Sequence, residues 1–362
     1  MMRLPVLVRV LRDPAVAHGL DAAGWDLLLR QADAANLDAF LLVLLEDAGL
    51  LDTVPAAPRA HLEWTRAGAA GHARAARYEV RQIGRALAGL GLPLILLKGA
   101  AYAMAGLDAG RGRLFSDIDI LVPKTRLPEV EAALMMHGWI TTHHDTYDQR
   151  YYREWMHELP PMQHARRGNS IDVHHAILPE TAPVRPDPDK LRAAAIPIAG
   201  APGLATLAPA DMVLHSAVHL FFDGEFDKGL RDLVDMHRLL GEFGAQPGFW
   251  DALPARAREL ELGRPLYYAL RYCPRLLGTV VPPAVQAAVA PAGPNPVLLW
   301  LMDRLFGRAL LPLHVSCEGI SSSLARFALY VRGNWLRMPP LLLARHLFHK
   351  AFITKHDESQ AA

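Results

Sequence analysis

The sequence predicts an α/β (α+β) protein in which a small sheet core lies between an N-terminal helical segment and a C-terminal helical domain. Three observations support this class. Apolar residues recur at helical spacing through residues 12–90, short apolar and alternating runs occupy residues 93–178, and helical spacing returns from Ala208 onward. With 362 residues and 51% hydrophobic content, the chain can bury a sizeable core and is long enough for two or three domains.

The N-terminal segment, residues 1–90, is expected to be helical. The stretch "GWDLLLRQADAANLDAFLLVLLEDAGLL" and the Ala/Arg-rich "RAGAAGHARAARYEVRQIGRALAGL" both carry apolar stripes at helical spacing. Gly89, Gly91 and Pro93 then interrupt the pattern. The opening "MMRLPVLVRVLRDP" is apolar but short and lacks a small-residue cleavage site, so we expect no signal peptide.

Residues 91–178 are expected to form the α/β core. "PLILL" (93–97) predicts a buried strand followed by a helix from Gly99, and the alternating "SDIDILV" (116–122) predicts a second strand. "RLPEVEAALMMHG" then predicts a helix closed by Gly138. Further strands are expected in "WITTHH" (139–144), "RYYREWMHEL" (150–159) and "PMQHARRGNSIDVHHAIL" (161–178), the last as a hairpin turning over residues 166–170.

Beyond the core, residues 179–207 are Pro-rich and are expected to form a linker, and residues 208–355 a helical domain. The stretches "PADMVLHSAVHLFF", "FDKGLRDLVDMHRLLGEF" and "FWDALPARARELELG" carry helical stripes, and prolines separate the later helices. Arg231 and Asp235 lie one helical turn apart, where they can pair.

The net charge and the cysteine spacing argue against some classes of protein. A net charge of +1 does not suit a protein that binds nucleic acid through its overall charge. Cys273 and Cys317 match no metal or redox spacing, which favours a reducing, cytoplasmic location. Gly91, Pro93 and Lys98 interrupt the most hydrophobic window, so we expect no membrane span.

Two aspartates stand in an unusually apolar frame. Successive side chains of a strand face opposite ways, so Asp117 and Asp119 share one face while the isoleucines between and after them face the core. Asp172, in "SIDVHH", has the same frame. If the two strands pair, three carboxylates converge, and such a set suits Mg²⁺ or Mn²⁺. Two such ions a few ångströms apart serve phosphoryl or nucleotidyl transfer.

The turn before this strand offers phosphate contacts. A strand, a glycine turn at Gly99 and a helix N-terminus present backbone N–H groups to an anion. Lys98 and Arg113 can add positive charge, with a strand-end cap and a surface arginine as their alternatives. Ser116 flanks the first aspartate and completes the candidate nucleotide-binding set, with a structural role as its alternative.

Together, "LLKGAAYAMAG" (96–106), "FSDIDILV" (115–122), "SIDVHH" and the helical "LRDLVDM" resemble nucleotidyltransferases of the DNA polymerase β superfamily, over roughly residues 20–240. Within it, the match is to the largely uncharacterised bacterial proteins with an L-K-G…R…D-I-D-L-L-V signature. The resemblance implies a small mixed sheet flanked by helices, two Mg²⁺ ions and an NTP substrate such as ATP. It also implies that Asp117 and Asp119 hold both ions, that Asp172 contacts the catalytic ion and helps deprotonate the attacking hydroxyl, and that Gly99 belongs to the phosphate turn. Ala100 stands where the superfamily commonly has serine.

We therefore expect a metal-dependent nucleotidyltransferase that moves an NMP from an NTP to a hydroxyl-bearing acceptor and releases pyrophosphate. A small molecule, an RNA and a protein all remain open as the acceptor. Two alternatives come from other classes: a non-catalytic nucleotide-binding sensor module, and a metal-dependent phosphohydrolase.

Three further features are weighed against plainer interpretations. None of the histidines shows the helical pair of a zinc protease, although His174 shares a face with Asp172 and His175 should face away. His219 or Asp235 is a candidate cleft residue in the helical half.

Residues 326–355 hold six Lys/Arg and no acid, which fits either a packed helix pair with a basic rim or a weak contact with an anionic surface, RNA or membrane.

Overall fold

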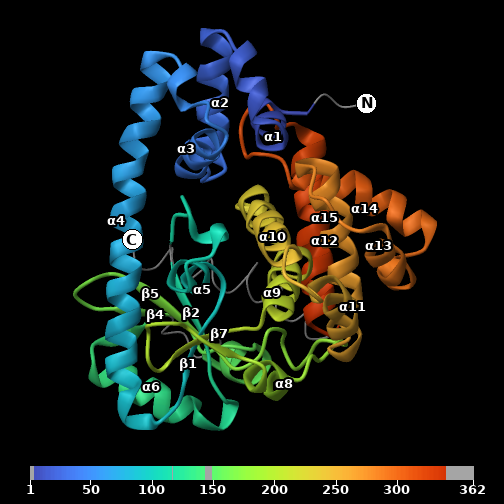
Figure 1. The fold of residues 1–362 in the computed structure, drawn as a ribbon. Coiled ribbons are helices and arrows are strands. Elements are labelled where there is room, and N and C mark those ends of the chain that lie inside the picture. Colours follow the sequence, from blue (N-terminus) through green and yellow to red (C-terminus); the bar gives the residue numbers. More distant parts are fainter. Residues whose placement is uncertain (1–3, 116, 143–148, 340–362) are drawn as a thin grey trace, which may run out of the picture.

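The structure is a computed structural model that describes residues 4–115, 117–142 and 149–339. The long helix α4 (Ala56–Leu87) runs along one side of a seven-stranded sheet, and the C-terminal helices cover the opposite side (Figure 1). The predicted α/β class, with helices before and after a mixed sheet, is confirmed.

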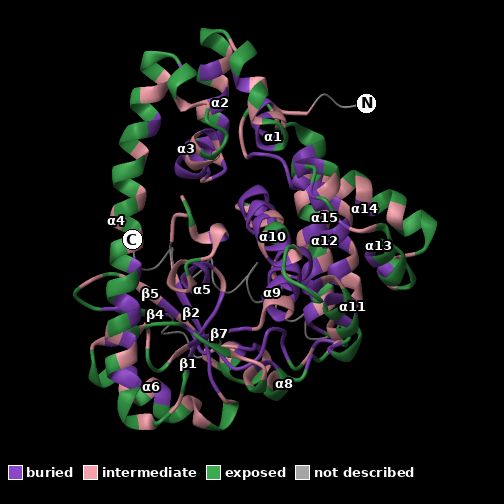
Figure 2. Ribbon diagram, viewed as in Figure 1, coloured by how far each residue is buried: buried purple, intermediate pink, exposed green. Residues whose placement is uncertain are grey.

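Four helices precede the sheet, in agreement with the helical periodicity of this segment. Asp21 accepts a hydrogen bond from Gly24 N at 2.8 Å and so caps the second helix. The buried side chains of α4 lie mostly in its C-terminal half, where it passes the sheet, and its N-terminal half is largely exposed (Figure 2). The helices before α4 are α1 (Val6–Arg12), α2 (Ala22–Ala34) and α3 (Asp38–Asp47).

The sheet has the order β3-β4-β5-β2-β1-β7-β6. Two neighbouring pairs are parallel, β2 with β5 and β1 with β7, and the other pairs are antiparallel. The sheet is therefore mixed, as the resemblance implied. The strands are β1 (Leu94–Leu96), β2 (Asp117–Leu121), β3 (Trp139–Thr141), β4 (Met162–His164), β5 (Ser170–His174), β6 (Ile196–Pro197) and β7 (Leu204–Thr206).

The central strands follow the predicted alternation. Ile118 and Ile120 of β2 are 4% and 0% exposed, because they face the helices that cover the sheet. Helix α5 (Lys98–Ala105) follows β1, and α6 (Leu127–Met136) follows β2. The turn at Gly138 has a φ of +93°, a left-handed conformation that favours glycine.

The prediction of a strand over residues 150–159 is wrong for most of its length. Tyr151–Trp155 form a π-helical turn, and only Glu158 makes a β-bridge, to His174. The Tyr151 ring packs edge-on against Tyr152 and Trp155, with ring centroids 5.4 and 6.1 Å apart. This aromatic packing along a helical turn outweighs the strand preference of the same residues.

Residues 179–207, expected as a linker, instead add structure to the core. They contain α8 (Pro188–Ala193), β6 and β7, and Leu94 of β1 pairs with Leu204 of β7. The prolines lie in the connections, at the start of α8 and in the edge strand β6, where a missing N–H costs little. The division of the chain into domains stays a prediction.

The C-terminal half is helical, as expected, and α9 lies at its centre, packed against α10, α11, α12 and α15. Nearly every residue of α9 is buried (Figure 2). Within the described ranges, no helix combines the length and apolar character needed to cross a membrane. The helices are α9 (Pro209–Phe222), α10 (Gly229–Gly244), α11 (Phe249–Glu259), α12 (Gly263–Leu277), α13 (Pro283–Val289), α14 (Pro296–Ala309) and α15 (Ile320–Arg337).

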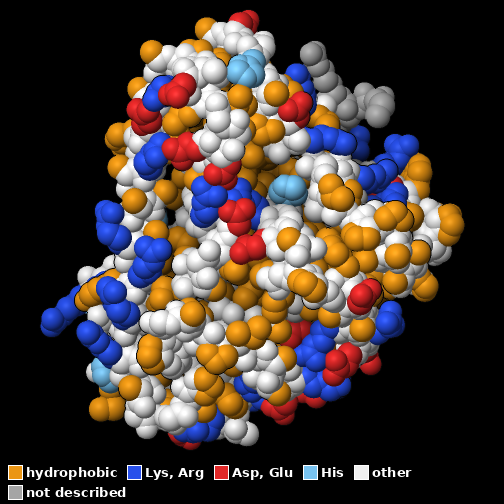
Figure 3. Space-filling model, viewed as in Figure 1, with side chains coloured by type: hydrophobic (Ala, Val, Ile, Leu, Met, Phe, Trp, Pro, Cys, Tyr) orange, Lys and Arg blue, Asp and Glu red, His pale blue; other side chains and the backbone are white. Residues whose placement is uncertain are grey.

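The two sides of the molecule differ in the types of side chain on their surface. Lys and Arg side chains gather along the edge formed by α4, and apolar side chains lie over α13 and α14 (Figure 3). On α15, Phe327, Val331 and Trp335 are 65%, 40% and 58% exposed. Of the basic stretch 326–355, residues 340–355 lie outside the described ranges, and its proposed contact with an anionic surface stays a prediction.

Candidate active site

The carboxylates that the sequence singled out lie on two paired strands. In the parallel register of β2 with β5, Asp117 is opposite Ser170 and Asp119 is opposite Asp172. Since Asp117 and Asp119 are two residues apart, all three carboxylates belong to one face of the sheet. The strand pairing on which their convergence depended is present.

This face borders a pocket of about 340 Å³, here called the acidic pocket. Five carboxylates line it, against two permanently positive side chains. Asp119 is 3% exposed and lies beneath the lining. The charged and histidine side chains of the lining are Lys98, Asp117, His157, Glu158, Asp172, His174, His215, His219, Asp223, Glu225 and Arg337.

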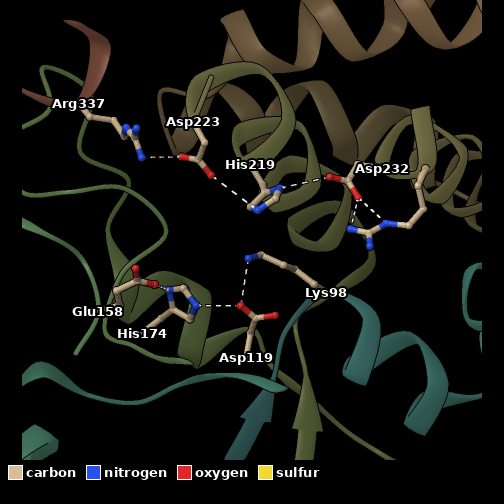
Figure 4. Close-up of polar contacts among 9 residues, drawn as sticks. Lys98, Asp119, Glu158, His174, His219, Asp223, Asp232 and Arg337 are labelled. Atoms are coloured by element: carbon tan, nitrogen blue, oxygen red, sulfur yellow. Dashed lines mark hydrogen bonds and ion pairs between the residues drawn. The ribbon is translucent and has the colours of Figure 1, made fainter. Parts of the chain in front are cut away.

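Asp119 is compensated by two neighbouring side chains, Lys98 and His174. Lys98 Nζ and His174 Nε2 each lie 3.0 Å from Asp119 Oδ1. Burial alone would raise the pKa of Asp119, but Lys98 and His174 hold it well below its ordinary value. Glu158, His174, Asp119 and Lys98 thus form one continuous polar chain across the floor of the pocket (Figure 4).

Asp172 has the opposite electrostatic environment. Its burial, followed by the negative charges of Asp119 and Glu158, raises its pKa to about 7. A carboxylate in this position is stabilised by an added positive charge, which a bound cation can supply.

Lys98 points into the pocket, toward Asp119, as its proposed nucleotide role requires. It begins α5 with a φ of +46°, a conformation that costs a non-glycine residue roughly 1 kcal/mol or more. The positive φ of this turn therefore falls on Lys98, one residue before Gly99. Strained backbone of this kind often occurs at functional sites.

Gly99 is buried in the first turn of α5, where the sequence placed it, but the structure gives a different reason for glycine. A Cβ at this position would overlap the guanidinium of Arg113 and come within 2.6 Å of its Cζ. Glycine therefore makes room for an arginine side chain.

Arg113 does not line the acidic pocket. Its Nε donates to Asp235 Oδ2 at 2.7 Å, and its guanidinium lies 5.9 Å from the ring centre of Tyr102. The side chain is 10% exposed and links the loop before β2 to α10. The Arg231–Asp235 pair expected from helical spacing does not form, because Arg113 occupies Asp235 and Arg231 donates to Asp232 instead.

Of the remaining candidates, Ser116 lies outside the described residues. His174, the last residue of β5, lines the pocket and His175 does not, as the alternation of side chains in an extended segment predicts. His219 also lines it, with its ring nitrogens 3.7 Å from Asp223 and Asp232.

Sequence reasoning missed four charged pocket residues, Glu158, Asp223, Glu225 and Arg337. Asp223 follows His215 and His219 at intervals of four, so these three residues form one polar stripe along α9 and its C-terminal cap, and that stripe was a readable signal. Glu158 carried no spacing signal. Arg337, which lies 3.8 Å from Asp223, comes from the end of α15, more than a hundred residues away in sequence.

Buried carboxylates on neighbouring central strands, facing a polar pocket beside a helix N-terminus, are typical of enzymes that transfer phosphoryl or nucleotidyl groups with divalent cations. The comparison with protein families supports the nucleotidyl-transfer part of this class. The chain belongs to the family described as uncharacterised nucleotidyltransferase, whose model matches residues 21–278. No curated protein and no solved structure matched the chain.

The family match includes every strand of the sheet and most of the acidic pocket. Three lining residues, Tyr330, Asn334 and Arg337, come from α15, beyond the matched range. The carboxylates and Lys98 therefore lie within the residues that match the family model. Helix α15, which contributes to the pocket wall, lies beyond the matched residues.

Proposed function

We propose that this protein transfers an NMP from an NTP to a hydroxyl-bearing acceptor and releases pyrophosphate. The observation that supports this most strongly is the register of β2 with β5. It sets Asp119 opposite Asp172, with Asp117 on the same face, beside a polar pocket of about 340 Å³ that Lys98 enters.

The donor set fits divalent cations. Asp117, Asp119 and Asp172 offer hard oxygen ligands of the kind that Mg²⁺ and Mn²⁺ prefer. The excess of carboxylates over permanent cations in the pocket, and the raised pKa of Asp172, are consistent with a site whose negative charge is balanced by bound ions. When bound, such ions neutralise the triphosphate and polarise the phosphoryl group under attack.

The other groups of the chain can bind and orient the nucleotide. Lys98 pairs with Asp119, and if Asp119 held a cation, the Lys98 ammonium would be available to the phosphates. The first backbone N–H groups of α5 add to this positive potential.

Asp172 is the proposed proton acceptor for the acceptor hydroxyl. Its carboxylate lines the pocket, where it can accept a proton from a hydroxyl held beside it. Arg113 is proposed to act indirectly, because its contact with Gly99 fixes the start of α5.

Transfer of labelled nucleotide tests the proposal. The protein is incubated with Mg²⁺, a cell extract and each NTP labelled with ³²P at the α-phosphate. We expect one NTP to label one class of acceptor with release of pyrophosphate. Release of orthophosphate without a labelled acceptor would instead indicate a phosphohydrolase, and binding of nucleotide without any turnover would indicate a sensor module.

A further inference from the structure

Three side chains at one end of the acidic pocket form a second group of ligand atoms, distinct from the three aspartates. His157, Glu158 and His174 each offer one nitrogen or oxygen atom, and these atoms all lie within 4.8 Å of one another. All three residues line the pocket, so a solute that enters it can reach them.

The backbone fixes this arrangement. Glu158 forms an antiparallel β-bridge with His174, and His175 N donates to His157 O at 2.8 Å. Residues directly opposite in an antiparallel pair project to the same side, so Glu158 and His174 point the same way. The rings of His157 and His174 lie nearby, with centroids 5.3 Å apart and planes inclined by 32°.

An independent observation points to a ligand. His157 is 9% exposed, and its Nδ1 is buried without a hydrogen-bond partner. A buried polar atom left in this state typically costs about 1–3 kcal/mol. This atom, on a residue that lines the polar pocket, is accounted for if it acts as a ligand of a cation.

We propose that His157, Glu158 and His174 bind a borderline divalent transition-metal ion of the Zn²⁺ or Co²⁺ class. Two imidazole nitrogens and one carboxylate oxygen favour such ions over Mg²⁺, which prefers oxygen ligands alone. The site differs in chemistry from the three aspartates and does not depend on the proposed nucleotide transfer.

Asp119 serves this site as an outer partner. The hydrogen bond of 3.0 Å from His174 Nε2 to Asp119 Oδ1 places the ring proton on Nε2, which leaves Nδ1 free to bind metal. The metal site is thereby linked to the carboxylate cluster through one imidazole.

The competing account is a charged His174 between two acids, with Asp119 on Nε2 and Glu158 Oε2 3.2 Å from Nδ1. This ion pair involves His174 and Glu158 but gives His157 no role. His157 is therefore the residue that separates a metal site from an ion pair.

Cobalt titration makes the test. The full chain is freed of metal with a chelator and titrated with Co²⁺, and visible absorption is recorded. We expect one strongly absorbing Co²⁺ per chain, displaced by Zn²⁺ but not by a large excess of Mg²⁺. His157→Gln should weaken this binding roughly tenfold or more. His215→Gln, which changes another histidine of the same pocket outside the cluster, should leave it unchanged.

Two further variants guard against ambiguous results. Glu158→Gln replaces His157→Gln if that variant does not fold, and Asp172→Asn should retain the Co²⁺ absorption. Three results would overturn the site: no Co²⁺ binding by the wild type, unchanged binding in the folded His157 or Glu158 variant, or binding that is lost in Asp172→Asn alone. None of these readouts requires turnover, so failure of the metal site is distinguishable from failure of the proposed nucleotide transfer.

Discussion

Asp119 and Asp172 occupy paired positions in the parallel strands β2 and β5, yet their surroundings act on them in opposite directions. Asp119 is held ionised by Lys98 and His174, and the pKa of Asp172 is raised by burial and by its acidic neighbours. Adjacent acids whose pKa values are driven apart are suited to different roles. One is suited to hold a cation and the other to exchange a proton.

Asp172→Asn should separate these roles. We expect turnover to fall by a factor of roughly 10² to 10⁴, because the proton acceptor is lost, with a much smaller change in nucleotide affinity. In chelator, the variant should melt at a higher temperature than the wild type, because a destabilised buried carboxylate is removed. Steady-state kinetics, nucleotide titration and thermal melting measure these effects. Equal losses of affinity and turnover would make Asp172 a simple metal ligand.

Lys98→Met should have opposite effects on the affinity for divalent cations and on the affinity for NTP. The substitution removes the ammonium beside Asp119, so without metal the free energy of unfolding should fall by up to about 3 kcal/mol. Divalent cations should then bind more tightly, since no ammonium competes for Asp119, and NTP should bind more weakly.

Lys124→Met is the matched control, because it breaks an exposed pair with Glu180 that is worth less than about 1 kcal/mol. Calorimetric titration with Mn²⁺ and with NTP measures both affinities. A parallel loss of both would show that Lys98 supports the pocket only by stabilising the fold.

Gly99→Ala should destabilise the protein by roughly 1–3 kcal/mol even without nucleotide, because the new Cβ forces Arg113 out of place and strains its bond to Asp235. Gly68→Ala is the control: Gly68 lies in the exposed part of α4 with nothing within 4 Å of a Cβ, so alanine should stabilise that helix by up to about 1 kcal/mol. Urea denaturation measures both changes. If Gly99→Ala is as stable as the wild type, Arg113 is not packed against this turn.

Asp38, at the start of α3 and away from the acidic pocket, should make the stability of the fold depend on pH. Burial, followed by the nearby Asp33, raises its pKa to about 7, and its Oδ1 has no hydrogen-bond partner. The folded state therefore binds this proton more tightly than the unfolded state, and stability should decrease as pH rises from about 4 to about 7. Asp38→Asn should be more stable than the wild type at pH 8, with little difference at pH 4. A gain of the same size at both pH values would contradict the raised pKa.

Much of the core could be predicted because it follows from local rules. The alternation of apolar and acidic residues in "SDIDILV" is enough to put Asp117 and Asp119 on one face, and glycine and proline mark the ends of the neighbouring elements. The rule for side-chain alternation also correctly separated His174 from His175.

The rest depends on contacts between distant residues. Arg113 meets Asp235 across 122 positions, so a local rule paired Asp235 with Arg231 instead. Glu158 reaches His174 only because a short extended segment returns alongside β5 after a π-helical turn, and residue preferences suggested a strand there. β7 joins the sheet by pairing with β1 from a segment whose composition resembles a linker.

The measurement that tests the central claim most directly is pyrophosphate release by the wild type and by Asp117→Asn, with Mg²⁺ or Mn²⁺, each NTP and the acceptor fraction. Circular dichroism checks that both proteins are folded. We predict metal-dependent pyrophosphate release by the wild type and none by Asp117→Asn, because the proposed cations need ligands from both aspartates of β2. Full activity in folded Asp117→Asn would contradict a reaction carried by this carboxylate cluster.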